Sequence, residues 1–224
     1  MQNQKSICLL LAILLISTQL CGCVASAIIG GAAVVGTSMH DRRSLGQQAN
    51  DESFELKALQ VIPQKYHDNS HFNVTAYNSD ILITGEAPNS ESANGIAAAV
   101  KTIPNVKRVY NELRVAKIST LAERSKDSYI TSKVKARLVD TPNVSANHIK
   151  VVTEHAEVFL MGLVTQAEAT AAIEATRRVA GVAKVINLLE VLSATQLKQF
   201  SINSHLEDEK NRTKRNHNNY YYSN

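Results

Sequence analysis

Cysteine, the residue type best suited to nucleophilic, redox and metal chemistry, is confined to one end of this chain of 224 residues. The three cysteines are Cys8, Cys21 and Cys23. The body of the protein therefore has no thiol for a disulfide framework, a zinc knuckle or a cysteine nucleophile.

The histidines are the next candidates for metal binding or catalysis. His67 and His71 have the i, i+4 spacing that chelates a metal on a helix, but Pro63 interrupts the helical pattern and predicts a loop there. His148 and His155 fall at a strand edge and in a turn, where we expect both to be solvated. We therefore expect no metal site.

Two acidic residues, Asp80 and Glu157, occupy equivalent turn positions, and we expect solvated turn formers rather than paired catalytic carboxylates. No phosphate loop is present, because the glycine-rich stretch at residues 30–36 lies near the amino terminus. These residues predict a protein that is not an enzyme, needs no cofactor and has no small-molecule substrate.

The amino terminus has the pattern of an export signal. Lys5 precedes an apolar run at residues 7–16, long enough for a signal peptide but too short to cross a bilayer. The sequence Leu20-Cys21-Gly22-Cys23 resembles a bacterial lipobox and predicts a lipoprotein signal peptide over residues 1–22. We expect Cys23 to carry several acyl chains, palmitate among them, because one chain anchors a protein only marginally. The alternative is an ordinary signal peptide with incidental cysteines.

The residues after Cys23 predict which membrane the lipoprotein is sorted to and the stalk that links the anchor to the folded part. In the sorting rule known for such lipoproteins, Asp after the lipidated cysteine favours the inner membrane, so Val24 predicts the outer membrane. We expect residues 23–45 to form a lipidated flexible stalk. Its apolar part, residues 24–39, is shorter than the roughly 20 residues that a membrane-spanning helix needs.

The rest of the chain is an internal repeat of two units, residues 46–115 and 124–193. Each unit opens with an apolar helical stripe and continues with a hairpin, an alanine-rich helix and a last strand. This order predicts an α+β fold of two tandem αββαβ domains, each a three-stranded mixed sheet covered by two helices. The stripes are Phe54, Ala58 and Val61 or Ile62 in the first unit and Ile130, Val134 and Leu138 in the second.

Local signals place the hairpins and the second helices. The hairpins pair residues 72–77 with 81–86 and residues 148–153 with 157–163. Thr165 and Glu168 fit a capping box that begins a helix over residues 166–179. Asn89 or Ser90 is suited to the same position in the first unit.

The repeated pattern of a strand, Gly85 or Gly162, an alanine-rich helix and Val-x-x-Val-x-Asn resembles the BON domain. A lipobox followed by two such domains is similar to the dual-BON outer-membrane lipoproteins, and the resemblance covers roughly residues 20–192. It implies a lipid-anchored, periplasm-facing outer-membrane protein that supports membrane integrity. It further implies binding of anionic phospholipid through the second domain, and association with cell division sites and the β-barrel assembly machinery.

The two units differ in charge. The first has six basic and eight acidic residues, a net charge of −2, whereas the second has nine and seven, a net charge of +2. Basic residues gather beside Tyr129 on the first helix of the second unit. Tyr129 itself stands at a position where the family typically has Trp. A basic and aromatic helix face is typical of an interfacial contact, although it also fits a solvated helix face. The expected phospholipid-binding residues are Tyr129, Ile130, Lys133, Lys135 and Arg137.

Two other functions remain as alternatives. The acidic first unit or an exposed strand edge could dock on an envelope assembly complex such as the β-barrel assembly machinery. A sequence pI near 8.9 could suggest nucleic-acid binding. The export signal, and the lack of a Gly-x-x-Gly clamp or an aromatic sheet motif, argue against nucleic acid. We expect residues 194–224 to form a polar, disordered tail, apart from one helical turn near Leu197 and Phe200.

Overall fold

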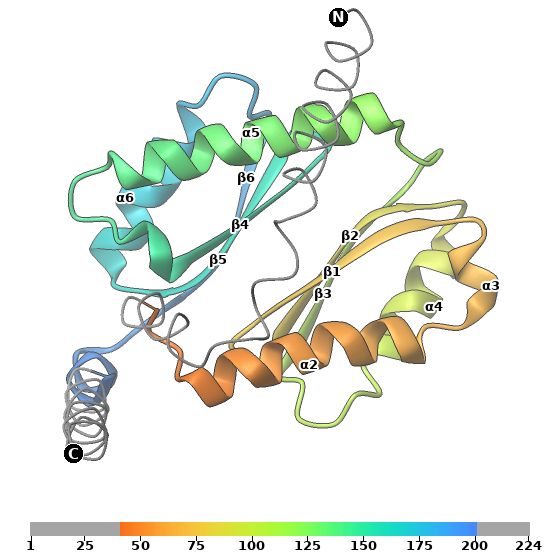
Figure 1. Ribbon diagram of the computed structural model, residues 1–224, viewed down its shortest axis with the longest axis horizontal. Helices are drawn as coiled ribbons and strands as arrows, with labels where there is room; N and C mark the ends of the chain where they lie inside the picture. Colours follow the sequence, from red (N-terminus) through yellow and green to blue (C-terminus); the bar gives the residue numbers. More distant parts are fainter. Residues whose placement is uncertain (1–40, 201–224) are drawn as a thin grey trace, which may run out of the picture. The chain divides into compact units, whose positions relative to one another are not determined.

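The computed structural model describes residues 41–200 (Figure 1). The predicted signal peptide, Cys23 and residues 24–40 of the predicted stalk lie outside the described residues, as do residues 201–224 of the tail. None of the helices in the described part has the length and apolar character required to cross a membrane.

The first unit is an αββαβ fold with one additional short helix. In its sheet, β2 is the central strand, antiparallel to β1 and parallel to β3. Helices α2 and α4 both contact the sheet and cover the same face of it (Figure 1). The elements are α2 (Leu45–Val61), α3 (Gln64–His67), β1 (His71–Tyr77), β2 (Asp80–Ala87), α4 (Ser90–Val100) and β3 (Arg108–Val115).

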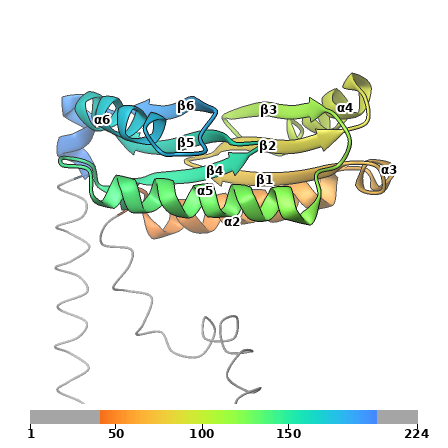
Figure 2. The same ribbon diagram turned by 90° about the horizontal axis from the view of Figure 1, so that it is seen from above.

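The second unit repeats this order. Strand β5 is central, antiparallel to β4 and parallel to β6, and α5 lies along β4 (Figure 2). The predicted α+β class and the two tandem αββαβ units with mixed three-stranded sheets are confirmed. The elements are α5 (Leu121–Val139), the 3-10 turn η4 (Ala146–His148), β4 (Ile149–Glu154), β5 (Glu157–Val164), α6 (Gln166–Arg177) and β6 (Lys184–Val191).

Side-chain caps explain where the second helices begin. The predicted capping box at α6 is confirmed, with the Thr165 hydroxyl accepting from the backbone of Glu168 and the Glu168 carboxylate accepting from Thr165 N–H. Asn89 caps α4 by accepting from Ser92 N–H at 2.8 Å. A second capping box, at Thr120 and Glu123, begins α5 and was not predicted.

Each unit has its own apolar core between its helices and its sheet. The predicted stripes are buried: Phe54, Ala58 and Ile62 in the first unit, and Ile130, Val134 and Leu138 in the second. Of the two residues proposed for the third position of the first stripe, Ile62 is buried and Val61 is exposed.

A third apolar cluster joins the two units, which the repeat pattern did not predict. Its buried members are Tyr77 and Leu82 of the first unit and Phe159, Met161, Leu163 and Leu192 of the second. Along β5, Val158 and Leu160 belong to the core of their own unit, whereas Phe159 and Met161 alternate with them and belong to the shared cluster. Because successive strand side chains point to opposite faces, the central strands are buried on both faces of their sheets.

Both ends of the described chain contact the folded body. The stalk was predicted to reach residue 45, but Arg42 pairs with Glu168 of α6 at 2.7 Å and Arg43 pairs with Asp51 of α2 at 2.9 Å. The helical turn expected near Leu197 and Phe200 lies within a helix over residues 194–200. Leu197 and Phe200 of that helix pack against the shared cluster.

Candidate functional site

Helix α5, the predicted lipid-contact element, is oriented by three buried residues. Ile130, Val134 and Leu138 recur every four positions and face the core of the second unit. Ile130 was expected among the phospholipid-binding residues, and that expectation was wrong because its side chain is only 1% exposed. Its role is to hold α5 on the sheet, which leaves the residues on either side of the stripe at the surface.

Tyr129, the residue before Ile130, has the opposite environment. Its side chain is 65% exposed, and the Lys133 ammonium lies over its ring, 4.8 Å from the centroid. The Lys133 ammonium also donates a hydrogen bond to the carbonyl of Ala180, in the loop between α6 and β6. The half-buried Lys133 therefore supports the aromatic ring and ties α5 to that loop.

Helix geometry separates the predicted basic residues into two groups. At about 100° per residue, Lys126, Tyr129, Lys133 and Arg137 fall within roughly 80° of one another on one side of the buried stripe. Lys126 and Arg137 are both exposed, and Lys126 was not among the predicted contacts. Lys135 is exposed too, but it lies roughly 120° from Tyr129 in the other direction. We call the first four residues the basic flank of α5.

The nearest acidic residue of α5 does not face solvent. Asp127 is buried, and its two carboxylate oxygens accept hydrogen bonds from His155 N–H at 2.9 Å and Ala156 N–H at 2.8 Å. Both turn residues have positive φ, 51° and 59°, as a two-residue type I′ hairpin requires. Asp127 therefore holds the β4–β5 turn against the helix, which leaves the exposed side of α5 more basic than the charge count suggested.

The exposed side of α2 in the first unit is less basic than that of α5. At the position of Tyr129, α2 has Ser53, and at the position of Lys135 it has Leu59. Leu56 and Leu59 are 60% and 46% exposed. Lys57 takes the position of Lys133 and is exposed. The two first helices therefore present different chemistry on the same scaffold.

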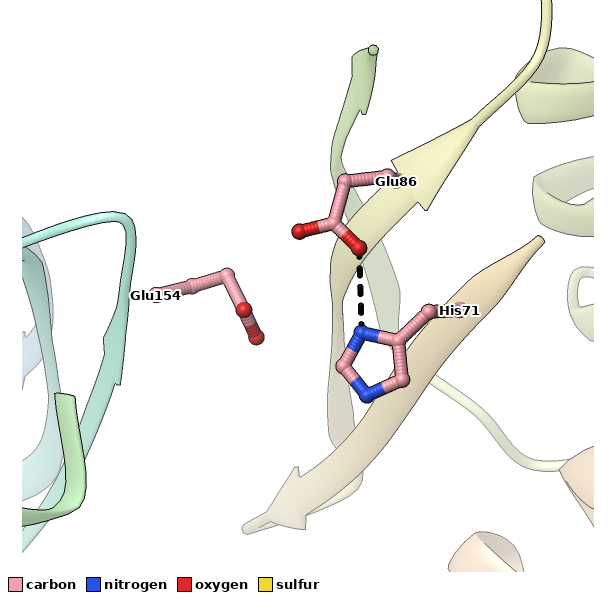
Figure 3. A group of neighbouring side chains, drawn as sticks. All are labelled: His71, Glu86 and Glu154. Carbon is pink, nitrogen blue, oxygen red and sulfur yellow. Dashed lines mark hydrogen bonds and ion pairs between the residues drawn. The ribbon is translucent and has the colours of Figure 1, made fainter. Parts of the chain in front are cut away.

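A buried polar cluster lies between the units, and sequence reasoning missed it. The ligand-type atoms of His71, Glu86 and Glu154 all lie within 4.8 Å of one another (Figure 3). His71 Nδ1 is 3.1 Å from Glu86 Oε2, because these residues are paired across β1 and β2. We name His71, Glu86, Glu154 and His155 the interdomain polar cluster.

Two features of the chain set the position of this cluster. Gly85 precedes Glu86 with φ of +119°, and a side chain there would collide with the carbonyl of His71, so only glycine allows β1 to approach so closely. The histidine expected to be a solvated turn residue, His155, instead has its Nε2 atom 2.6 Å from Glu86 Oε1. The sequence did contain a signal for this cluster. Glu86 lies within an apolar strand segment, and the alternation of side chains along a strand would place it in a buried position.

The other histidine and the two turn acids also differ from expectation. His148 is largely buried and lies 3.6 Å from Glu168, rather than solvated. Asp80 is buried and pairs with Arg108 at 2.6 Å, while Glu157 pairs with Arg114 of the other unit at 2.6 Å. Asp80 and Arg108 are register partners on the neighbouring strands β2 and β3, whereas the ion pair of Glu157 with Arg114 joins β5 to β3 of the other unit.

Burial changes the titration of several of these groups. It raises the pKa of Glu154, and the neighbouring Glu86 carboxylate adds to the rise against the hydrogen bond from Asn73. Burial also lowers the pKa of His148, helped by the positive charge of Arg42. For Glu168, burial acts to raise the pKa, but hydrogen bonds from Arg42 and Thr165 outweigh it and the pKa is lowered.

Two tandem αββαβ units, each with a buried helix stripe over a mixed sheet, define the class of this protein. The BON domain matches the chain twice, at residues 50–117 and 126–193, and the chain belongs to the BON domain family.

Among known proteins, the chain is similar to the outer membrane lipoprotein DolP of Haemophilus influenzae, at 39% identity over 185 residues. That similarity covers 81% of this chain and 95% of the relative. The 21 kDa hemolysin of Actinobacillus pleuropneumoniae is 38% identical over 154 residues, covering 66% of this chain and 78% of its own. Osmotically-inducible protein Y of Escherichia coli is 42% identical over 71 residues, 31% of this chain and 35% of its own.

Proposed function

We propose that this protein is a non-enzymatic outer-membrane lipoprotein, anchored through Cys23 and facing the periplasm. Its second BON domain binds anionic phospholipid and thereby supports the integrity of the envelope. The observation that carries the proposal is the 65% exposed Tyr129 ring within the basic flank of α5. The relative named as an outer membrane lipoprotein, and the predicted lipobox, support the location.

The chemistry of the basic flank suits an anionic bilayer surface. Each basic residue near such a surface contributes about 1 kcal/mol, so Lys126, Lys133 and Arg137 together contribute about 3 kcal/mol. The aromatic ring adds an apolar contribution when it enters the interface. This sum gives only weak binding from solution, detectable at millimolar lipid, because a dissociation constant of 1 mM corresponds to about 4 kcal/mol. It is sufficient for a protein that the lipid anchor already holds at the membrane, because the second contact is then intramolecular.

The test measures attachment of the unlipidated fragment 41–200 to vesicles with and without anionic lipid. The fragment begins at residue 41 because Arg42 and Arg43 bind the folded body. We expect binding only to anionic vesicles. Because salt screens charges beyond about 8 Å at 0.15 M but leaves apolar contacts nearly intact, Tyr129→Ala should weaken binding at all salt concentrations. Lys133→Glu and Arg137→Glu should weaken it mainly at low salt, and Arg137→Glu does so without removing the bond to Ala180.

The matched control is Lys57→Glu, since Lys57 occupies the same place on α2 as Lys133 on α5. Lys57→Glu should change attachment to anionic vesicles little. The variant Tyr129→Trp should bind more tightly, because Trp is enriched at membrane interfaces. Equal binding to neutral vesicles, or loss through Lys57→Glu but not through Tyr129→Ala, would contradict the proposal.

The second candidate function is docking on an envelope assembly complex, of which the β-barrel assembly machinery is one example. The observation that favours it is the pair of exposed leucines, Leu56 and Leu59, on the outer face of α2. Exposed apolar residues on one helix face are typical of a helix-in-groove contact. Leu56→Ser with Leu59→Ser should leave vesicle binding unchanged and abolish cross-linking to such a complex, if docking takes place there.

The lipid anchor has its own test. If Cys23 is acylated, Cys23→Ser should abolish labelling by a fatty-acid analogue and release the protein from the membrane fraction. Labelling that persists in this variant would refute the anchor without affecting the vesicle experiment, which uses an unlipidated fragment.

A further inference from the structure

Glu86 is a fully buried carboxylate in the interdomain polar cluster. A carboxylate in that environment needs a counter-charge. Glu86 lies on the central strand β2, on the face turned toward the second unit, and its exposed fraction is 0%. A buried charge is stable only when it is paired or coordinates a metal. The groups that surround Glu86 therefore determine what this part of the molecule binds.

The cluster holds more negative than permanent positive charge. Glu154, from the second unit, is also buried and shares the cluster with Glu86. Within residues 41–200, no lysine or arginine forms an ion pair with either carboxylate. The basic groups beside them are His71 and His155, whose neutral imidazole nitrogens are common metal ligands.

The hydrogen bonds around the two carboxylates orient them and leave atoms free. The Ser119 hydroxyl donates to Glu86 Oε2 at 3.3 Å, and the Asn73 amide donates to Glu154 Oε2 at 3.2 Å. Glu86 Oε1 and His155 Nε2 are both buried and have no hydrogen-bond partner among the described residues, although they lie 2.6 Å apart. Second-layer hydrogen bonds that fix carboxylates, with unsatisfied oxygen and nitrogen atoms facing inward, are typical of a metal site.

We propose that the interdomain polar cluster binds a divalent transition-metal ion, with His71, Glu86 and Glu154 as ligands and His155 beside Glu86 as the fourth. A mixed set of imidazole nitrogens and carboxylate oxygens suits zinc as well as other divalent transition metals, and zinc is the ion used in the test. A tetrahedral zinc ion with bonds of about 2.0–2.2 Å holds its ligand atoms roughly 3.3 Å apart. The three principal ligand atoms, all within 4.8 Å of one another, need to approach by at most about 1.5 Å to reach that spacing.

The ion would neutralise both buried carboxylates and would connect the two BON domains. His71 and Glu86 belong to the first unit, and Glu154 and His155 to the second, so the site is complete only when the sheets are docked. Zinc binding therefore stabilises the docked arrangement, in which Tyr77 and Phe159 share one apolar cluster. This inference is independent of the proposed phospholipid contact, which lies on the outer side of α5.

The test uses the full-length protein in detergent, freed of metal with a chelator and titrated with Zn²⁺ by calorimetry. We expect saturable binding of about one ion per chain and a higher Tm of the zinc-loaded protein. Glu154→Gln and His71→Ala should lower the affinity by at least about 100-fold, and Asn73→Ala, which removes only the orienting hydrogen bond, by about 10-fold. His67→Ala is the matched control, because His67 lies outside the cluster and should leave the affinity unchanged.

Glu154→Gln keeps the size and shape of the side chain, so circular dichroism should show a folded protein even if Glu86→Gln does not fold. Co²⁺ in place of zinc should give the visible absorption of a tetrahedral ion without a thiolate-to-cobalt band, which excludes the amino-terminal cysteines as ligands. Absence of saturable Zn²⁺ binding, a thiolate band, or an affinity within about threefold of wild type in folded Glu154→Gln and His71→Ala would each overturn the proposal.

Discussion

The two BON domains repeat their buried interactions and differ in their exposed ones. Asp51 accepts hydrogen bonds from Asn78 N–H and Ser79 N–H, and Asp127 accepts from the equivalent turn amides of the second unit. On the outer sides of the same helices, α2 exposes leucines whereas α5 exposes Tyr129 and basic residues. Both domains therefore use a buried carboxylate to hold the hairpin turn. The exposed side of the first helix has no such structural role and can serve a different function in each domain.

The faces by which the two sheets dock are also unequal. The inward row of β5 contributes Phe159, Met161 and Leu163, whereas β2 contributes Leu82 to the shared apolar cluster and places Glu86 farther along the same face. The second unit thus supplies most of the apolar surface, while each unit supplies one buried carboxylate, Glu86 or Glu154. The predictions below test whether these differences carry the stability and the function assigned to them.

The largest effect is expected from Phe159→Ala. Phe159 is fully buried in the shared cluster, and removing a buried phenyl ring costs about 3–5 kcal/mol of unfolding free energy. Urea denaturation measures the loss, and hydrogen exchange should show faster opening of β2 in the other unit as well. A loss confined to the second unit would show that the two domains are stable independently. Leu56→Ala, at an exposed site, should stay within about 0.5 kcal/mol of wild type.

The next largest loss of unfolding free energy is expected from substituting Asp127 and Asp51, the carboxylates that bind the hairpin turns. Asp127→Asn leaves one acceptor oxygen for two turn amides, so we expect a loss of about 1–3 kcal/mol. Asp51→Asn should cost about 1 kcal/mol more, because Asp51 also binds the Arg43 guanidinium at 2.9 Å. Equal losses in thermal or urea unfolding would show that Arg43 adds nothing to the first unit.

The contact between Arg42 and Glu168 gives a smaller effect that depends on pH. Arg42→Ala should lower the unfolding free energy by about 1–2 kcal/mol at pH 7. Because the pKa of Glu168 is lower in the folded state than its ordinary value of about 4.3, this stabilisation is present above that pH and is lost as the pH falls through the folded pKa. The difference between the two proteins should therefore shrink as the pH falls through the folded pKa of Glu168, down to the contribution of the hydrogen bond from Arg42 to the Leu163 carbonyl. A difference that does not change with pH would rule out the carboxylate as the partner.

The smallest effect on stability is expected where the effect on function is greatest. Tyr129→Ala removes an exposed ring, so the unfolding free energy should change by less than about 0.5 kcal/mol while vesicle binding is lost. A loss of 2 kcal/mol or more would mean that the ring packs on the fold and that weaker membrane binding reports partial unfolding.

The sequence by itself determined the elements and their order. Apolar residues four positions apart at Ile130, Val134 and Leu138 predicted the buried side of α5, and Thr165 with Glu168 predicted the start of α6. These signals are local, because helix periodicity, capping and two-residue hairpins depend on side chains a few positions apart. The charge difference between the units could likewise be counted directly.

Only the tertiary structure decided which distant residues meet. Docking of the two sheets turned His155 and Glu157 from expected solvated turn residues into partners of Glu86 and Arg114. It also assembled the interdomain polar cluster from β1, β2 and the β4–β5 hairpin. Strand alternation gives the face on which a side chain lies but not what covers that face, because the covering surface comes from a part of the chain far away in sequence.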